Sequence, residues 1–152
     1  MSTNRGLSRR EFISCSAAFA LGVLCCPDLA QASEQTEIAP IITYAPDPLA
    51  LSRSGRSWYS TTFTLNRSYS TGQQFYDGSS VGIELTSSCD VSDATFEVSL
   101  VRNKTSLGTA TLRANRFVRA EWPNVGSGLY PFEFKASADK PIVCSNVAMF
   151  SW

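Results

Sequence analysis

From residue 58 to the end of the chain, apolar side chains recur at every second position, and no other feature limits the fold as strongly. The stretch 130–136 shows this period most clearly, because Pro131 and Glu133 separate Tyr130, Phe132 and Phe134. Successive side chains of a β-strand point to opposite faces of its sheet, so this period is that of strands with one buried face. No segment holds an apolar stripe at helical spacing over three turns. The sequence therefore predicts an all-β domain.

Turn signals such as Asp77-Gly78 separate the alternating stretches. Seven or eight short strands follow from the pattern, at 41–44, 58–66, 81–89, 96–100, 107–114, 117–122, 130–136 and 142–152. Such a series, without helices between the strands, is typical of an antiparallel β-sandwich. Jelly-roll and immunoglobulin-like topologies fit the pattern equally well. A doubly wound sheet does not fit, because β-α-β alternation is missing.

The first 32 residues have the three-part layout of a secretory signal. Arg9 and Arg10 lie in a basic start, residues 15–26 form an apolar run, and Ala30-Gln31-Ala32 is a small-residue cleavage site. The apolar run is shorter than the roughly 20 residues that a membrane-spanning helix needs. We therefore predict cleavage after Ala32 and no stable membrane span in the mature chain.

The segment Ser8-Arg9-Arg10-Glu11-Phe12-Ile13 resembles the twin-arginine (Tat) signal of bacteria, whose pattern is Ser/Thr-Arg-Arg-x-Phe-Leu-Lys. Ser8, Arg9, Arg10 and Phe12 match this pattern, while Ile13 is a conservative departure and Ser14 replaces the usual Lys. The resemblance implies export of the folded protein, to the cell envelope or outside the cell, and to the periplasm in a Gram-negative bacterium.

Two other kinds of export signal are possible alternatives. A general secretory signal with a chance arginine pair leads to the same destination. A lipoprotein signal fits poorly, because neither Cys25 nor Cys26 has both the Leu and the small residue that should precede it. We therefore divide the chain into a signal peptide at 1–32, an extended N-terminal arm at 33–56 and a sandwich domain at 57–152.

The absence of histidine excludes several classes of enzyme. The 152 residues contain no histidine, and 13 Lys and Arg balance 13 Asp and Glu. A Ser-His-Asp hydrolase, a Cys-His protease and a His-ligated zinc site are therefore excluded. Zero net charge argues against binding to nucleic acid. The mature part has no Gly-rich phosphate-binding fingerprint and no CxxC, so we expect no cofactor.

Cys89 and Cys144 are the two cysteines that remain after removal of the signal. An even number of cysteines in an exported chain is typical of a disulfide, and we predict one between these residues. Closing a loop of this length stabilises a fold by roughly 4 kcal/mol in the chain-entropy model.

Five aromatic residues lie in or beside a polar Ser/Thr/Gln-rich stretch: Trp58, Tyr59, Tyr69, Phe75 and Tyr76. Exposed aromatic rings stack on sugar rings, so these residues are candidates for glycan binding. The alternative is that the rings belong to the core or cover a sheet edge, as aromatic residues commonly do in sandwiches.

Arg113, Arg116 and Arg119 form a small basic group around Asn115. Arginines can grip a carboxylate or phosphate of a partner. With a period of two, Arg113 and Arg119 share one face and Arg116 points away, so Arg113 and Arg119 are the candidates. The alternative is a solvated strand face.

Acidic residues suggest two further kinds of site. A calcium site near the cysteines is one hypothesis, although Asp in turns usually caps the backbone. Its candidate ligands are Asp90, Asp93, Glu97 and Asp139. A carboxylate pair for glycoside hydrolysis is the other hypothesis. Its candidates are Glu84, Glu121 and Glu133.

The sequence thus favours an exported, non-catalytic module that binds a ligand or partner at or beyond the cell surface, either a glycan or a surface protein. The alternative is a small carboxylate-dependent glycan hydrolase.

Overall fold

The computed structural model describes residues 36–45, 57–137 and 139–152, and every regular element in these ranges is a β-strand. The predicted all-β class is confirmed. No helix in these ranges is long and apolar enough to cross a membrane. The described strands are β1 (Ile41–Ala45), β2 (Ser57–Leu65), β3 (Ser68–Ser70), β4 (Gln74–Tyr76), β5 (Val81–Ser88), β6 (Thr95–Arg102), β7 (Thr105–Arg113), β8 (Arg116–Trp122), β9 (Gly128–Tyr130), β10 (Phe132–Ala136) and β11 (Ile142–Ser151).

The described part therefore has eleven strands, where seven or eight were predicted. The additional strands β3, β4 and β9 are three residues each, too short for a period to show in the sequence. The predicted export signal, with Arg9, Arg10, Phe12 and the cleavage site after Ala32, lies outside the described residues.

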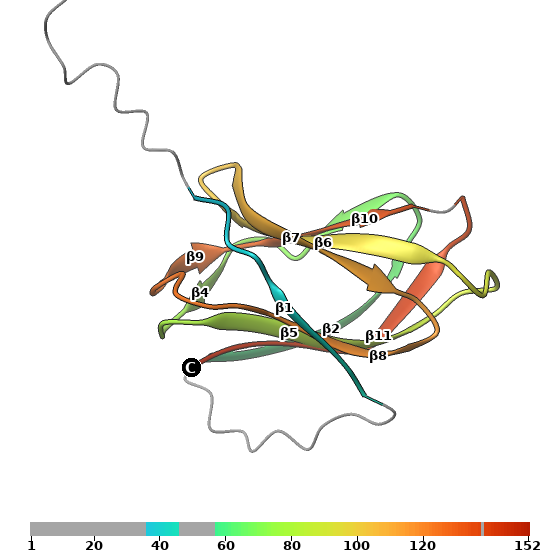
Figure 1. Cartoon of the computed structure of the whole chain (residues 1–152), viewed down its shortest axis with the longest axis horizontal. Helices are drawn as coiled ribbons and strands as arrows, with labels where there is room; N and C mark the ends of the chain where they lie inside the picture. The colour runs from blue at the N-terminus through green and yellow to red at the C-terminus, as the bar shows by residue number, and fades with distance from the viewer. Residues whose placement is uncertain (1–35, 46–56, 138) are drawn as a thin grey trace, which may run out of the picture. The chain divides into compact units, whose positions relative to one another are not determined.

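The strands form two main antiparallel sheets and one small one. A five-stranded sheet has the order β1-β8-β5-β11-β2, a four-stranded sheet has the order β3-β10-β6-β7, and β4 pairs with β9. In Figure 1 the two main sheets form separate layers. The fold is thus β-sandwich-like, with the core between the layers.

Trp122 on β8 illustrates how the core joins the two sheets. Its side chain is fully buried, and its indole Nε1 donates a hydrogen bond of 2.9 Å to the carbonyl of Gly108 on β7. Its ring meets that of Phe132 on β10 edge-on, with the centroids 5.6 Å apart. Val118 and Ala120, which lie with Trp122 on the same face of β8, are also fully buried.

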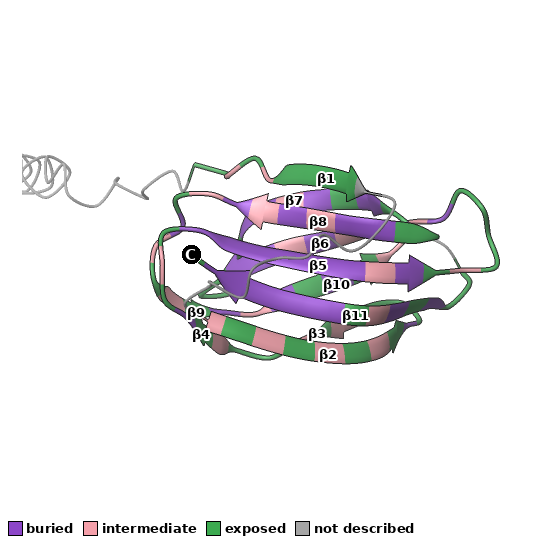
Figure 2. Cartoon of the chain, turned by 90° about the horizontal axis from the view of Figure 1, so that it is seen from below, coloured by how far each residue is buried: buried purple, intermediate pink, exposed green. Residues whose placement is uncertain are grey.

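The central strands of the five-stranded sheet are buried on both faces. Figure 2 shows burial along most of β5 and the second half of β11, whereas β2 at the sheet edge alternates with a period of two. Strands covered on both faces carry near-continuous apolar runs rather than alternation. The outer face of this sheet is therefore partly shielded from solvent along β5 and the second half of β11.

Part of the predicted N-terminal arm belongs to the sandwich. The backbone N–H of Ile38 donates to the carbonyl of Leu107 on β7, and the following strand β1 pairs antiparallel with β8. The segment thereby joins the edges of both sheets. Its strand coincides with the predicted short strand at 41–44.

The predicted disulfide is not formed: Cys89 and Cys144 are both free thiols in the structure. The β5–β11 register pairs Cys144 with Ser87, two residues before Cys89. Diagonal neighbours in a sheet have Cα atoms about 7–8 Å apart, more than the roughly 4.4–6.8 Å that a disulfide spans. The backbone N–H of Cys89 is in addition held by the Oδ1 atom of Asn115, at 2.7 Å.

Candidate functional site

The outer face of the five-stranded sheet brings together several of the predicted site residues. The register places Trp58 opposite Phe150, Phe150 opposite Gly82, and Gly82 opposite Glu121. The next row of the same face carries Glu84 opposite Arg119. We call this surface the aromatic face and define it by Trp58, Gly82, Glu84, Arg119, Glu121, Phe150 and Trp152.

Three aromatic rings form a continuous stack on the aromatic face. The centroids of Trp58 and Phe150 are 5.7 Å apart with the planes at 22°, and those of Phe150 and Trp152 are 5.5 Å apart at 27°. The two indoles are 40% and 41% exposed, whereas the central ring of Phe150 is only 3% exposed. The stack therefore presents two accessible indoles held in place by a buried ring.

Gly82 makes room for this arrangement. A Cβ atom at this position would lie 2.7 Å from Cε2 and 2.8 Å from Cζ of Phe150, and 3.2 Å from the Trp152 ring. The absence of a side chain on β5 thus lets both rings lie close to the sheet.

Arg119 closes the stack on the side of β8. Its guanidinium carbon lies 4.7 Å from the centroid of the Phe150 ring and 5.7 Å from that of Trp152. The same side chain forms an ion pair with Glu121. Cation–π contact and ion pairing together fix the position of the guanidinium and leave Glu121 with a partner.

Glu84 points to the outer face, as the strand period requires, but it is not solvated. It is only 8% exposed, and its Oε2 atom has no hydrogen-bond partner among the described residues. Burial raises the pKa of its carboxyl group, and the charge of Arg119 opposes this shift only in part. One oxygen of this carboxyl group, on the same face as the aromatic stack, thus lacks a hydrogen-bond partner.

A shallow groove runs past Glu84 and Trp58. Its walls include Ser60 on β2 and Asn146 on β11. Asn146 lies in a β-bulge, where the pairing register shifts between Cys144 and Val147, and its φ of 50° is left-handed. Bulges re-aim side chains near binding sites, and here an amide joins a hydroxyl and a carboxyl along one groove.

Arg113 and Arg116 lie elsewhere, in a pocket with Ser92, Asp93 and Thr95. The prediction that Arg113 shares a face with Arg119 is wrong, because the two-residue turn Ala114-Asn115 takes the chain from the four-stranded to the five-stranded sheet. A strand period does not continue through such a turn.

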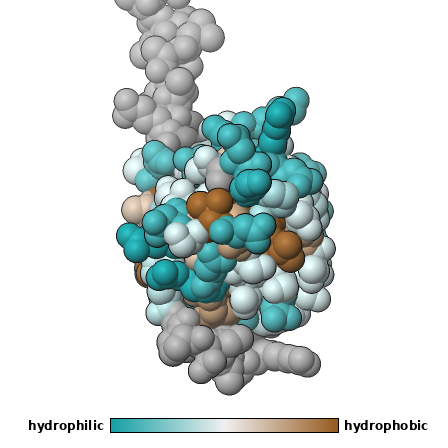
Figure 3. Space-filling view, turned by 90° about the vertical axis from the view of Figure 1, so that its right-hand side faces the viewer, coloured by the Kyte–Doolittle hydropathy of each residue, from teal (hydrophilic) through white to brown (hydrophobic). Residues whose placement is uncertain are grey.

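Figure 3 shows the end of the molecule on the right of Figure 1, where hydrophilic residues predominate.

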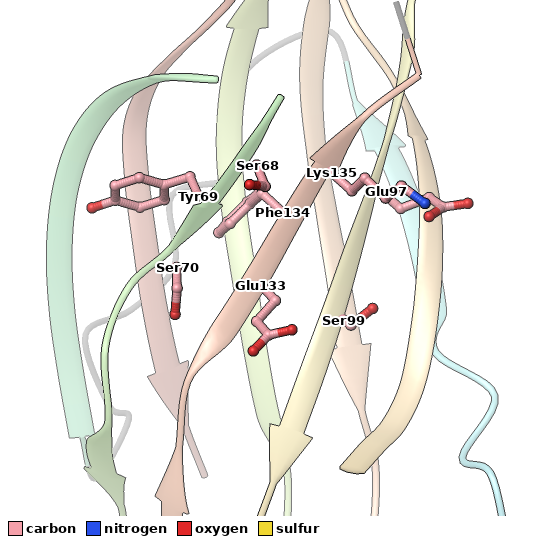
Figure 4. A pocket seen from close by; sticks show the side chains of 8 residues that line it. All are labelled: Ser68, Tyr69, Ser70, Glu97, Ser99, Glu133, Phe134 and Lys135. Atoms are coloured by element: carbon pink, nitrogen blue, oxygen red, sulfur yellow. The ribbon is translucent and has the colours of Figure 1, made fainter. Parts of the chain in front are cut away.

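The outer face of the four-stranded sheet carries a second groove, which is rich in hydroxyl groups (Figure 4). The register aligns Ser70, Glu133 and Ser99 in one row, and Ser68, Lys135 and Glu97 in the next. No exposed aromatic ring lines it, because Tyr69 is partly buried and stacks on Phe63 with 3.8 Å between centroids. This groove can form hydrogen bonds but lacks a stacking platform.

Two of the other predicted aromatic residues, Tyr59 and Tyr76, serve the core, whereas Phe75 on β4 is 52% exposed. Tyr76 is fully buried, its hydroxyl bonds Gln74 Oε1 at 3.0 Å, and burial raises the pKa of its phenol. Tyr59 packs edge-on against Tyr76 and donates its hydroxyl hydrogen to the carbonyl of Phe75 at 2.7 Å. These rings have no free face for a ligand.

The predicted carboxylates do not all share one site. Glu84 and Glu121 are diagonal neighbours on the aromatic face, whereas Glu133 belongs to the other sheet. The suggested calcium ligands do not gather either. Within the described ranges, no group of three or more acidic or cysteine residues is placed to hold a metal ion.

Sequence reasoning missed Gly82, Asn146, Phe150 and Trp152. A signal for the last two was present, since Phe150 alternates with the inward Met149 and gives β11 apolar residues on both faces. Such a strand is typical of a sheet covered on both sides. Nothing in the sequence indicated the bulge at Asn146 or the stacking over Gly82.

No protein-family model matches the sequence, and no curated protein is significantly similar to it. Among solved structures, the chain is similar to the structure of a family two carbohydrate esterase from Cellvibrio japonicus, with 12% sequence identity and a TM-score of 0.36. The match covers 73% of this chain and 33% of that chain, so this chain spans about a third of the esterase's length. A likeness at this level supports no conclusion about activity.

Proposed function

We propose that this chain is an exported, non-catalytic module that binds a glycan on the aromatic face. The observation that carries the proposal is the stack of Trp58, Phe150 and Trp152, in which two accessible indoles flank a buried ring. The apolar CH faces of a sugar ring stack on exposed indoles, and the sugar hydroxyls need hydrogen-bonding groups beside them. Glu84 and Asn146 in the adjoining groove supply such groups. Export rests on the signal in the first 32 residues.

We infer further that the topology is a jelly roll rather than immunoglobulin-like. Apart from β1 and the short β4–β9 pair, the strands divide into β8-β5-β11-β2 and β3-β10-β6-β7. Eight strands divided equally between two sheets are typical of the jelly roll, which is common in lectin domains. An immunoglobulin constant domain divides seven strands into four and three.

The alternative function, a carboxylate-dependent glycan hydrolase, has one observation in its favour. Glu84 has a raised pKa, as a general acid does, and Glu121 lies diagonally across from it. However, Glu121 is engaged by Arg119, and the groove is a shallow depression without walls that exclude water. Binding without turnover fits this geometry better.

The test is a binding assay of the purified protein on bacterial cell-wall and capsular polysaccharides, with the variant Trp58→Ala. We expect the variant to lose about fivefold to thirtyfold in affinity, since stacking on a fixed ring contributes on the order of 1–2 kcal/mol. Leu129→Ala is the matched control, because Leu129 is an exposed apolar residue on β9, outside the aromatic face. Equal binding by the two variants, or no binding by the unmodified protein, would overturn the proposal.

The same assay separates binding from turnover. Glu121→Gln should leave the bound glycan intact, whatever the loss of the ion pair with Arg119 does to the affinity, because a binding module cleaves no bond. Release of reducing ends by the unmodified protein, lost in this variant, would establish the hydrolase instead.

A further inference from the structure

The pocket around Arg113 and Arg116 has the donors of an oxyanion site. Arg113 ends β7 and Arg116 begins β8, so the two guanidinium groups come from different sheets. Ser92 and Thr95 line the same pocket, and each side chain carries a hydroxyl group. Donors thus come from three separate segments of the chain.

Both guanidinium groups are available for a ligand. Arg113 and Arg116 are exposed, and neither forms an ion pair with any residue in the described ranges. Arg116 is nevertheless held in place, because its guanidinium carbon lies 5.6 Å from the ring centroid of Tyr44. A cation over a ring keeps its N–H groups free at the edge for hydrogen bonding.

The walls of the pocket are fixed to one another by Asn115. This residue adopts a left-handed φ of 62° in the turn between the two arginines. Its Oδ1 accepts a hydrogen bond from the N–H of Cys89 at 2.7 Å, and its Nδ2 donates to the carbonyl of Val91 at 2.9 Å. The turn that carries the arginines is therefore bound to the loop that leads to Ser92. Preorganised donors lose less entropy when a ligand binds.

We propose that this pocket binds a phosphate-type oxyanion, that is, a phosphate or sulfate group of a larger ligand or the free ion. A tetrahedral oxyanion can accept hydrogen bonds from several directions, whereas a carboxylate presents only two oxygens in one plane. Donors from three segments match the tetrahedral group. The pocket lies apart from the aromatic face, so the proposal does not rest on glycan binding there.

Asp93 allows a sharp test of the proposal, because this residue lines the pocket and its negative charge repels an anion. Asp93→Asn should therefore tighten anion binding by several-fold, a gain that misfolding cannot produce. Arg113→Gln and Arg116→Gln should each weaken binding by about tenfold or more. Arg67→Gln is the matched control, since Arg67 is an exposed arginine between β2 and β3, outside the pocket.

The assay is titration of the purified protein with inorganic phosphate, sulfate or acetate at constant ionic strength, followed by NMR shifts of amides 92–95 and 113–116. The proposal is supported if phosphate and sulfate bind saturably and the affinity falls from Asp93→Asn to the unmodified protein to Arg113→Gln. Loss in Arg67→Gln as large as in Arg113→Gln would overturn it, as would absence of saturable phosphate binding. Acetate binding as tight as phosphate binding would refute the tetrahedral site in favour of a carboxylate site.

Discussion

Replacing Gly82 by alanine tests whether the aromatic stack depends on an empty position beneath it. The new Cβ would lie 2.7–2.8 Å from two ring carbons of Phe150, closer than carbon atoms approach in proteins. Phe150 has little room to move, because it is 3% exposed and lies between the rings of Trp58 and Trp152. Overpacking of this kind costs about 1–3 kcal/mol. It outweighs the roughly 0.5–1 kcal/mol that alanine gains over glycine in a strand.

Thermal unfolding measures this cost, at roughly 4 °C for each kcal/mol in a domain of this size. We therefore expect a lower Tm for Gly82→Ala, together with a changed tryptophan fluorescence spectrum and weaker glycan binding. The decisive comparison is the same substitution in a Phe150→Leu background. Without the Phe150 ring, the added methyl group loses its two shortest contacts and keeps only the one of 3.2 Å to the Trp152 ring, so Gly82→Ala should cost much less stability. An equal loss of stability in both backgrounds would refute the steric explanation.

Three other substitutions or treatments test the remaining parts of the structure. Native alkylation should modify Cys89 and spare Cys144, because burial raises the pKa of the Cys144 thiol to about 12. Mass spectrometry after denaturation should then find Cys89 alkylated, Cys144 as a free thiol and no disulfide between them. Trp122→Phe should lower the free energy of unfolding by about 1–3 kcal/mol, measured by denaturant titration, because it leaves a gap and removes the hydrogen bond to the Gly108 carbonyl. Glu84→Gln should raise the Tm at pH 7, because ionisation of a carboxyl group whose pKa is raised in the folded state destabilises the fold. This gain should vanish below the group's ordinary pKa of 4.5, where the carboxyl group is protonated in both states.

The long strands were predictable because apolar residues recur at every second position along each of them. The alternation of Tyr130, Phe132 and Phe134 reflects the buried face of β10 and its neighbourhood, and the burial pattern of β10 follows it. The three-residue strands β3, β4 and β9 were not predictable, since three residues contain no period. The spatial order of strands was also out of reach, because it depends on contacts between segments far apart in the sequence.

Single site residues were predictable from the strand on which each lies, but the grouping of residues from different strands was not. Trp58 and Arg119 could be nominated individually, but their meeting on one face depends on three intervening strand pairings. Arg113 and Arg116 fall into one pocket because a turn at Asn115 breaks the strand period between them. The free thiols also depend on register, which offsets Cys89 and Cys144 by two residues.

Glu84 is the residue at which stability and binding conflict. A strand position that faces outward normally lets a carboxylate be hydrated, yet here Glu84 is buried beside the groove with one oxygen unpaired. A buried polar group without a partner destabilises a fold by about 1–3 kcal/mol. If the side chain turns this oxygen toward the groove, a sugar hydroxyl that donates to it would remove the penalty on binding. Glu84→Gln should therefore make the protein more stable and its glycan affinity lower, whereas a purely structural Glu84 would change the Tm without changing the affinity.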